Sequence, residues 1–538
     1  MKVRKVYLVY IVLSVFFFFS CNSFKSKSQD SDTTIHKKAE EAITPGNFND
    51  NSGIKFDSAA IQKFLSEKPL FREFSKEFDT FYRANNFSYV WYDNNGLIET
   101  SGTLISAIEN IEGEGVTANV PYKDSLDQLL NNIKNVANNN KPDINAELML
   151  TGEYFFYAKK IWAGSLSSKT TSMNWYLPRK KFSYSALLED NLSKGTLAGV
   201  EGPVIAMQHA GLKKALTHYR DIEKQGGEVT VPGISKTIKP NQASTVIPFI
   251  RKRLFQLGDV HENDTSDVYD VKLAEAVNYA KLRYGLKPDS LITNSLINEI
   301  NIPAKKRVEQ IMVNMERMRW VTGDTSSNEL ILVNIPEYTL RYFEDNKEVW
   351  NCNVVVGKPM TKTVIFSGKM QYVVFSPYWN VPPSIINGEV LPGMRRNKNY
   401  LARHNMEWNG GRVRQKPGPS NSLGLVKFLF PNSNNIYLHD TPSKSLFSED
   451  SRAFSHGCIR VAKPRDLAIR VLQQMPEWTP QKIDAAMHAG KEQYVTLKKT
   501  IPVYIGYFTA FMSSDGQLNF RTDVYKRDAS LLEMLMQN

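Results

Sequence analysis

The spacing of apolar residues changes once along the 538-residue chain, and that change constrains the fold more than any other feature. Over residues 56–216, apolar side chains recur at helical spacing. From Glu329 onward they fall into short alternating runs separated by turn residues, as in residues 338–343, a pattern typical of β-strands. The sequence therefore predicts an α+β multidomain protein, with a mainly helical first part and a β-rich second part.

A short unit of three helical patterns separates these two parts. The patterns cover residues 246–257, 271–284 and 290–300, and a glycine follows each of the first two. Glycine past the last periodic residue is a common signal for the end of a helix. We expect a compact three-helix unit over residues 244–303, followed by one more helix over residues 305–320.

Domain boundaries follow from these changes. We expect a helical domain over residues 55–243, in which Trp91, Trp162 and Trp175 act as core or interface anchors, and a β-rich domain over residues 304–538. Within the second domain, residues 383–419 are polar and rich in Gly, Arg and Asn. This composition predicts an irregular, lid-like insertion over a site.

The start of the chain resembles an export signal. Three basic residues among the first five precede an almost wholly apolar stretch over residues 6–20. Cys21 then follows Phe18, Phe19 and Ser20 in an arrangement that resembles a bacterial lipoprotein box, which implies a signal peptide over residues 1–20 and lipidation of Cys21. Phe18 departs from the usual aliphatic residue, so an uncleaved signal anchor is the alternative. Polar residues 21–54 are expected to form a flexible tether.

Charge and cysteine content exclude some classes of function. The 67 basic and 55 acidic residues give a net charge of +12, which attracts polyanions. We expect no nucleic-acid binding, because the chain has neither a basic arm nor the aromatic and basic signature of a known module. Anionic membranes and carboxylate-rich wall polymers fit the charge. Three cysteines do not make a disulfide framework, and Cys352, in a strand-like stretch, is expected to be a buried inert thiol.

The most specific string in the chain is Ser455-His456-Gly457-Cys458. With ordinary residue frequencies, its chance of occurring in a chain of this length is on the order of one in a thousand. His439 lies 19 residues before Cys458. A cysteine nucleophile needs a partner that withdraws its proton, and a histidine distant in sequence but near in space is the usual partner. The sequence therefore indicates a Cys458–His439 pair.

Zinc binding is the chemical alternative for these residues. His439, His456 and Cys458 are all permissible zinc ligands. A structural zinc site usually takes four ligands in short paired spacings, and no second Cys or His pair is present. We therefore expect no metal and no other cofactor.

The motif resembles that of the YkuD-type L,D-transpeptidase family, in which a histidine is followed, after a gap, by Ser or Thr and then His-Gly-Cys. The resemblance extends to residues 378–383, 418–424 and 520–525. The spacing within residues 244–303 is similar to that of the peptidoglycan-binding type 1 module. The whole layout resembles the large periplasmic subfamily of diderm bacteria, which implies a helical scaffold, a wall-binding module and a β-rich catalytic domain.

By position, the resemblance implies that Cys458 is the nucleophile and His439 the base that activates it. Backbone N–H groups of Gly457 and Cys458 would receive the developing oxyanion, and Gly457 permits the close backbone approach. Tyr437 either donates a further hydrogen bond to the oxyanion or packs as a strand aromatic.

For the other residues near the motif, the sequence allows more than one role. His456 is expected to support the loop rather than transfer a proton. Ser455 either fixes a histidine tautomer or makes a turn. Arg460, where many smaller family members have asparagine, either holds a substrate carboxylate or braces the loop. Asp440 orients His439 through its side chain or through its backbone carbonyl.

The reaction implied by the resemblance is transfer between peptidoglycan stem peptides. Cys458 would attack the carbonyl of a diamino acid joined to D-Ala, and an amine of a neighbouring stem would resolve the thioester. Trp408 is expected to contact the substrate, and the lid-like stretch around it would exclude water. If water attacked the thioester instead of an amine, the protein would be an L,D-carboxypeptidase. A protein without catalytic activity that anchors the membrane to the wall is the alternative from a different functional class. Carbapenem-type β-lactams are the expected inhibitors, and a tethered periplasmic protein the expected location.

Overall fold

The computed structural model describes residues 53–537, apart from 136–140, 165–169, 178–182, 200–201, 263 and 322–327. The predicted signal peptide, the lipidation site Cys21 and most of the predicted tether lie outside the described residues. In the part of the chain that is described, no helix has the length and apolar character needed to cross a membrane.

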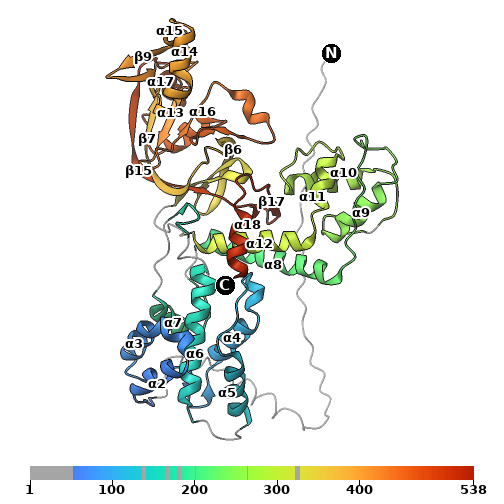
Figure 1. Ribbon diagram of the computed structural model, residues 1–538, viewed down its shortest axis with the longest axis vertical. Coiled ribbons are helices and arrows are strands. Elements are labelled where there is room, and N and C mark those ends of the chain that lie inside the picture. Colours follow the sequence, from blue (N-terminus) through green and yellow to red (C-terminus); the bar gives the residue numbers. More distant parts are fainter. Residues whose placement is uncertain are drawn as a thin grey trace, which may run out of the picture. The chain divides into compact units, whose positions relative to one another are not determined.

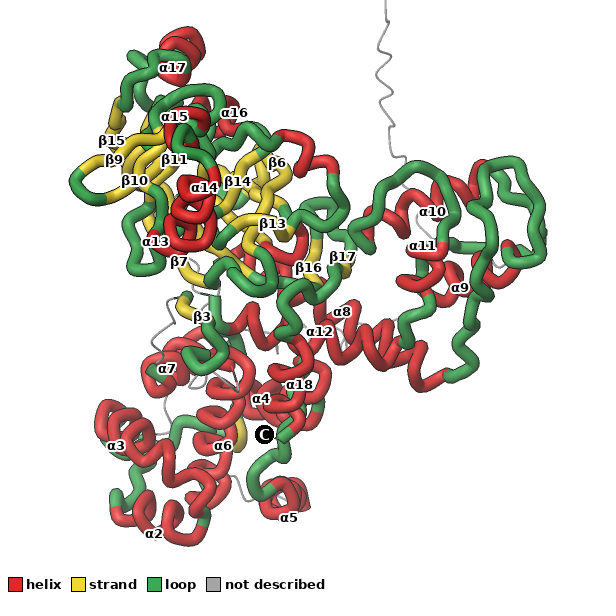
Figure 2. Tube along the Cα trace, turned by 45° about the horizontal axis from the view of Figure 1, so that its top comes forward, coloured by secondary structure: helices red, strands yellow, loops and turns green. Residues whose placement is uncertain are grey.

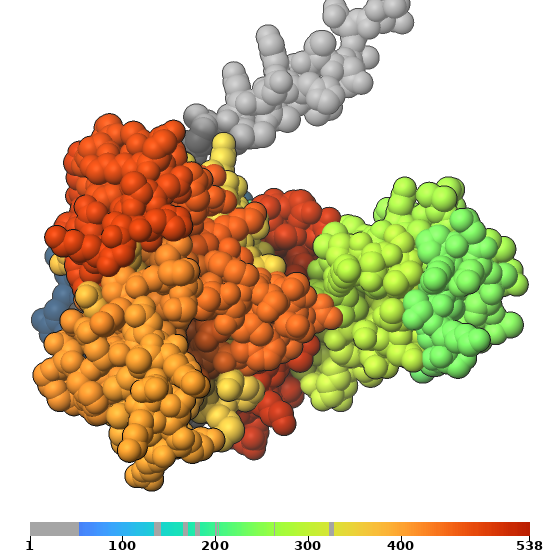
Figure 3. Space-filling view, turned by 90° about the horizontal axis from the view of Figure 1, so that it is seen from above, coloured from blue at the N-terminus to red at the C-terminus, as the bar shows by residue number. Residues whose placement is uncertain are grey.

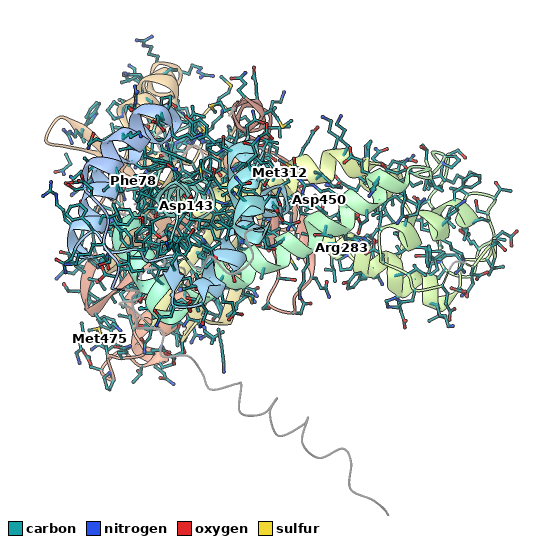
Figure 4. All side chains as sticks on the ribbon, turned by 90° about the horizontal axis from the view of Figure 1, so that it is seen from below. Phe78, Asp143, Arg283, Met312, Asp450 and Met475 are labelled. Carbon is teal, nitrogen blue, oxygen red and sulfur yellow. The ribbon has the colours of Figure 1, made fainter. Side chains whose placement is uncertain are left out.

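Helices form the first part of the chain, as the spacing of apolar residues predicts (Figure 1). Phe78, which is labelled in Figure 4, is fully buried in its core, and Trp91 and Trp162 are buried there as well, as anchors should be. The elements are α2 (Ala59–Glu67), η1 (Pro69–Phe74), α3 (Ser75–Ala84), β1 (Tyr92–Asp93), β2 (Gly96–Leu97), α4 (Glu99–Glu109), η2 (Ile111–Glu114), α5 (Lys123–Asn135), α6 (Ile144–Tyr157), η3 (Ala158–Gly164) and α7 (Tyr184–Lys194).

Three helices form where the sequence predicts them between residues 244 and 303. Gly258 and Gly285 end the first two helices at positive φ, 81° and 70°, where a glycine is favoured. Asp270 and Thr293 cap the N-termini of the second and third helices with their side chains. The helices are α9 (Ile247–Gln256), α10 (Val271–Arg283) and α11 (Asn294–Ile300), and they follow α8 (Pro203–Gln225) and precede α12 (Ala304–Arg319).

A closed β-sheet forms the second part, with its strands in yellow in Figure 2. The strand order is β11-β12-β14-β6-β5-β4-β15-β7, and β7 also pairs with β11, so the order returns to its start. The strands are β4 (Glu329–Asn334), β5 (Thr339–Glu344), β6 (Lys347–Gly357), β7 (Ile365–Phe375), β11 (Val426–Leu429), β12 (Leu438–His439), β14 (Ile459–Val461) and β15 (Gln493–Gly506), with β13 (Ala453–Ser455) paired beside β6.

Shorter elements complete the second part of the chain. After β4 comes η5 (Ile335–Glu337), and η7 (Lys444–Ser448) follows β12. The remaining elements are α16 (Pro464–Val471), α17 (Pro480–Met487), β16 (Ala510–Met512), β17 (Leu518–Phe520) and α18 (Asp528–Met536). The last of these, α18, packs on α12, and Asp528 at its start forms an ion pair with Arg317 at 2.6 Å.

One strand of this sheet comes from the predicted helical domain. β3 (Trp175–Tyr176) runs parallel to β7, with Trp175 opposite Ile365. Trp175 is buried and meets the rings of Trp320 and Phe508 edge-on, so it is an interface anchor as expected. The pairing itself was not predicted, because two residues are too few to reveal a strand period.

The insertion is an ordered small subdomain, so the prediction of an irregular stretch was wrong. Its sheet joins β8 (Trp379–Asn380), β10 (Arg412–Gln415) and β9 (Met406–Asn409), and its helical turns are α13 (Pro383–Ile385), η6 (Ile386–Val390), α14 (Leu391–Arg396) and α15 (Tyr400–Arg403). Val381, Val390 and Val413 form its own apolar cluster. In the space-filling view, the light orange insertion stands as a separate surface lobe (Figure 3).

Candidate active site

Two neighbouring strands bring the predicted catalytic residues together. β12 and β14 run parallel, with Leu438 opposite Ile459 and His439 opposite Arg460. Cys458 immediately precedes β14, and the N–H of Ile459 donates to the carbonyl of Tyr437 at 3.2 Å. Because this ladder joins the two segments, His439 lies on one strand and Cys458 lies directly before the neighbouring strand.

His439 is buried and held in one tautomer. Its Nδ1 lies 2.5 Å from the backbone carbonyl of Asp440, which can only accept, so Nδ1 carries the proton and Nε2 the lone pair. Burial, together with the positive charge of Arg460, lowers the pKa of His439 to about 4. The imidazole is therefore neutral at pH 7, as a general base must be.

Asp440 orients His439 through its carbonyl rather than through its side chain. The carboxylate oxygens instead accept hydrogen bonds from the N–H of Leu425 at 2.8 Å and of Thr441 at 2.7 Å, and form an ion pair with Lys444. Gly424 is required beside this carboxylate, because a Cβ there would lie 2.3 Å from it. The carboxylate thus anchors the segment that follows the base.

The thiol of Cys458 faces polar groups of the segment before β12. Its Sγ lies 3.7 Å from the carbonyl oxygen of Asn435, and both the hydroxyl and the backbone N–H of Tyr437 hydrogen-bond to the sulfur. The Tyr437 ring also meets the His439 ring edge-on at 5.7 Å. Burial raises the pKa of Cys458 above its ordinary value, although Tyr437 and Arg460 oppose that rise.

Ser455 closes the nucleophile loop, residues 455–458, by a turn. Its hydroxyl donates to the carbonyl of Cys458 at 2.5 Å and accepts the N–H of Gly457 at 3.0 Å. The N–H of Gly457, predicted to receive the oxyanion, is therefore engaged inside the loop. Within the described residues, the N–H of Cys458 has no acceptor. Gly457 adopts φ 122°, a conformation that favours glycine.

A turn that sequence reasoning missed supports this loop from behind. The hydroxyl of Thr361 donates to the carbonyl of Ser455 at 2.9 Å, and the hydroxyl of Thr363 donates to the carbonyl of Gly457 at 2.8 Å. Isolated threonines between two strands carry no sequence signal of such a role.

His456 contacts the insertion rather than the catalytic pair. Its Nε2 lies 3.8 Å from Glu389 on η6, and both side chains are about half exposed. Trp408, predicted to face substrate, lies on β9 opposite Val413 and is half exposed as well. The insertion therefore reaches the nucleophile loop through Glu389, a residue that the sequence did not single out.

Arg460 carries an uncompensated positive charge beside the pair. No hydrogen bond or ion pair joins its side chain to another of the described residues, and its buried Nε has no partner. The cation acts on both Cys458 and His439. It does not brace the loop by hydrogen bonding, which leaves the guanidinium able to receive an anion.

Metal ligation was the chemical alternative for this site. Within residues 53–537, apart from the gaps noted above, no three or more His, Cys, Asp or Glu side chains are grouped so that they could hold a metal ion. His439 contacts the backbone carbonyl of Asp440, and His456 lies near the carboxylate of Glu389.

Comparisons with known proteins agree with the motif. Residues 328–505 match the model of the YkuD L,D-transpeptidase catalytic domain, and residues 76–201 match a scaffold domain. A Haemophilus influenzae protein, whose curated name assigns it provisionally to the L,D-transpeptidases, is 32% identical over 254 residues. That match covers 43% of this chain and 51% of the relative, so the chain spans about half the length of the curated relative it matches.

Solved structures similar to the chain include L,D-transpeptidases. One from Mycobacterium smegmatis is 14% identical with a TM-score of 0.19, over 33% of this chain and 58% of that chain. One from Stackebrandtia nassauensis is 14% identical with a TM-score of 0.20, over 52% and 97%. The match over residues 328–505 and the curated relative both point to the same family. Residues 328–505 of this chain are a YkuD-type L,D-transpeptidase catalytic domain, and a scaffold domain precedes them.

Proposed function

We propose that the protein is an L,D-transpeptidase that cross-links the diamino acids of peptidoglycan stem peptides through a thioester on Cys458, with release of D-Ala. The observation that carries the proposal is the placement of a neutral His439, its tautomer fixed by Asp440, on the strand beside the one that Cys458 precedes. The family match over residues 328–505 supports the same class of reaction.

Acylation begins when Sγ of Cys458 attacks the carbonyl carbon of the diamino acid. Nε2 of His439 takes the thiol proton as the C–S bond forms, and the carbonyl oxygen becomes an oxyanion. The free N–H of Cys458 and the hydroxyl of Tyr437 are the donors placed to stabilise it. When the C–N bond breaks, His439 returns the proton to the amine of D-Ala, which leaves.

Deacylation repeats these steps with an amine of a second stem peptide. The amine attacks the thioester carbonyl, His439 accepts its proton, and the C–S bond breaks to leave a peptide cross-link. The sulfur then regains the proton from His439. The bond energy of the first peptide is conserved in the thioester, so no nucleotide is consumed.

The resting pair is a thiol and a neutral imidazole rather than a thiolate and an imidazolium. The pKa of His439 is lowered to about 4 and that of Cys458 is raised, both chiefly by burial. Proton transfer within the free protein is therefore uphill, and it is coupled to attack on a bound carbonyl. A thiol kept protonated is also less open to oxidation.

Arg460 supplies the charge that a carboxylate-bearing donor needs. Its guanidinium has no protein partner among the described residues and lies beside the pair. We infer that it binds the terminal carboxylate of D-Ala, which places the scissile carbonyl against Cys458.

We propose that the three-helix module over residues 244–303 binds peptidoglycan while the catalytic domain acts.

We further propose that residues 1–20 direct export to the periplasm of a diderm bacterium and that Cys21 carries the lipid tether. Labelled palmitate incorporated into the natural chain and not into Cys21→Ser would support the tether, whereas labelling of both or neither would count against it.

The reaction is tested with residues 50–538, which form one compact unit. The chain is incubated with tetrapeptide-bearing muropeptides, beside Cys458→Ala and the matched control Cys352→Ala, and products are followed by mass spectrometry. Release of D-Ala and dimers that depend on Cys458 are expected. Release of D-Ala without dimers would point to a carboxypeptidase. No turnover by a folded chain that still binds sacculi would point to a non-catalytic anchor.

A further inference from the structure

The turn between β6 and β7 lies directly behind the nucleophile loop. β13 runs parallel to β6, which places Ser455 opposite Gly357. Only glycine fits at 357, because a Cβ there would lie 2.1 Å from the carbonyl oxygen of Thr361. From this turn, the N–H of Lys358 and the hydroxyl of Thr361 both donate to the Ser455 carbonyl, at 3.0 and 2.9 Å. The turn therefore fixes the start of the loop.

Thr363, which ends the turn, fixes the step before the nucleophile. Its side chain is fully buried, and its hydroxyl oxygen accepts the N–H of Gly357 at 2.9 Å. A hydroxyl has one proton, and a carbonyl can only accept, so that proton goes to the carbonyl of Gly457 at 2.8 Å. Both directions of hydrogen bonding at this hydroxyl are thus determined by its partners.

Holding the Gly457 carbonyl also aims the N–H of Cys458. The two groups belong to one peptide unit, and in a planar trans peptide the C=O and the N–H point in opposite directions. Gly457, at φ 122°, has no side chain to restrict this unit. The bond from Thr363 pulls the carbonyl inward, so the N–H of Cys458 points away from the turn.

Tyr525 holds Thr363 in turn. The Tyr525 hydroxyl accepts the N–H of Thr363 at 3.2 Å and donates to the carbonyl of Gly357 at 2.7 Å, and its ring is almost completely buried. The N–H of Tyr525 donates to the hydroxyl of Tyr507 at 2.7 Å. Both tyrosines lie beyond residue 505, where the match to the catalytic domain ends.

We propose that Thr363 is a positioning residue that aims the Cys458 N–H at the oxyanion, and that Tyr525 brings the segment after the family domain into the active site by holding Thr363. The inference deepens the proposed function, on which it rests in taking Cys458 as the nucleophile. Neither residue touches substrate. Each acts through the peptide unit that joins Gly457 to Cys458.

Two reactions of the Cys458 thiol distinguish a misplaced Cys458 N–H from a general disruption of the active site. Acylation of Cys458 by p-nitrophenyl acetate passes through an oxyanion, whereas alkylation by iodoacetamide does not. Both rates are measured on residues 50–538, with the Cys458→Ala background subtracted. In Thr363→Val, acylation should fall roughly tenfold to a hundredfold, less than the ~10²–10³ for complete loss of an oxyanion donor. Alkylation should stay within about twofold, because sulfur and base are unchanged.

Three further variants test the same bonds. Thr363→Ser keeps the hydroxyl and should restore acylation. Tyr525→Phe keeps the ring and should lower acylation less than Thr363→Val. Tyr342→Phe is the matched control, because it removes a buried hydroxyl on β5 that donates to Glu329 on β4 at 2.7 Å. It should leave the ratio of the two rates unchanged.

The positioning role is overturned if acylation and alkylation fall together in Thr363→Val and Tyr525→Phe, if serine fails to restore acylation, or if the natural chain cleaves the ester no faster than Cys458→Ala. Failure of the proposed function looks different. The muropeptide assay would then give no D-Ala, while the ratio of ester acylation to alkylation would still fall in Thr363→Val.

Discussion

Cys352 and Cys458 place the same side chain in two different regions of one sheet. Cys352 lies within β6, opposite Leu340, where burial raises the pKa of its thiol to about 11. Cys458 lies in a loop at the start of β14, and burial raises its pKa as well. Burial alone therefore does not distinguish a reactive cysteine from an inert one.

The surroundings of the two sulfurs differ in what they can do. Among the described residues, the backbone N–H groups of Ala462 and Lys463 lie beside the thiol of Cys352. Cys458 has Tyr437 on its sulfur and the cation of Arg460 nearby, and its own N–H is unengaged among the described residues. The comparison teaches that a nucleophile depends on its backbone and its partners, not on a low resting pKa.

The largest expected effect is that of replacing Cys458, the proposed nucleophile. Cys458→Ala should reduce D-Ala release from muropeptides to background, a loss of ~10⁴-fold or more, because no thioester forms. Cys352→Ala should retain activity within about twofold. Equal losses in the two variants would break the comparison between the two thiols.

The next largest effect should come from replacing His439, the proposed base. His439→Gln should lower kcat for D-Ala release by ~10²–10⁴, because the thiol proton then has no acceptor. The matched control is His488→Gln, since His488 also places Nδ1 on a backbone carbonyl, that of Asp484 at 2.8 Å, but is exposed just after the end of α17. Turnover by His439→Gln equal to that of the control would remove His439 from the mechanism.

The pH dependence of alkylation should sharpen the comparison. Because the pKa of Cys458 is raised, its reaction with iodoacetamide should be slow at pH 7 and still increase above pH 9. Arg460→Gln removes a cation that favours the thiolate, so the curve should move to higher pH. A rate already at its maximum at pH 7 would indicate a standing thiolate and contradict the thiol–imidazole pair. Cys352 should react only after unfolding.

The smallest effect concerns stability. Cys352→Ala removes a buried sulfur from a packed strand and should lower the free energy of unfolding by about 1–2 kcal/mol. Cys458→Ala, at a partly exposed loop position, should change it by less than about 0.5 kcal/mol. Urea denaturation of both variants measures the difference, and a reversed order would show that the loop is the better packed region.

The architecture could be predicted where a residue pattern repeats. Three turns of helical spacing and a glycine stop predicted α9 and α10, and alternation predicted the β-rich part. β3 has only two residues, and the strands of the insertion have four or fewer, so neither gives a readable period. The order within the insertion comes from its own apolar cluster, whose three valines are far apart in sequence.

The site could be predicted where chemistry needs a particular side chain. Ser-His-Gly-Cys and the upstream histidine singled out Cys458 and His439, and the two strands bring them together. Whether His439 is oriented by the carbonyl or by the carboxylate of Asp440 depends on the direction of the backbone, which the sequence does not specify. Thr363 acts through one hydroxyl on one carbonyl, and its partner Gly457 lies 94 residues away.

The pairing of β3 with β7 has a consequence for any attempt to produce the protein in pieces. β11 pairs with β7 only over Tyr372–Phe375, while β3 pairs with Ile365 and Phe366 on a stretch that β11 does not reach. A fragment beginning at residue 328 would leave the amide and carbonyl groups of that stretch without their partner. Such open strands recruit other chains. A truncated catalytic fragment is thus expected to self-associate at concentrations where the longer chain stays monodisperse.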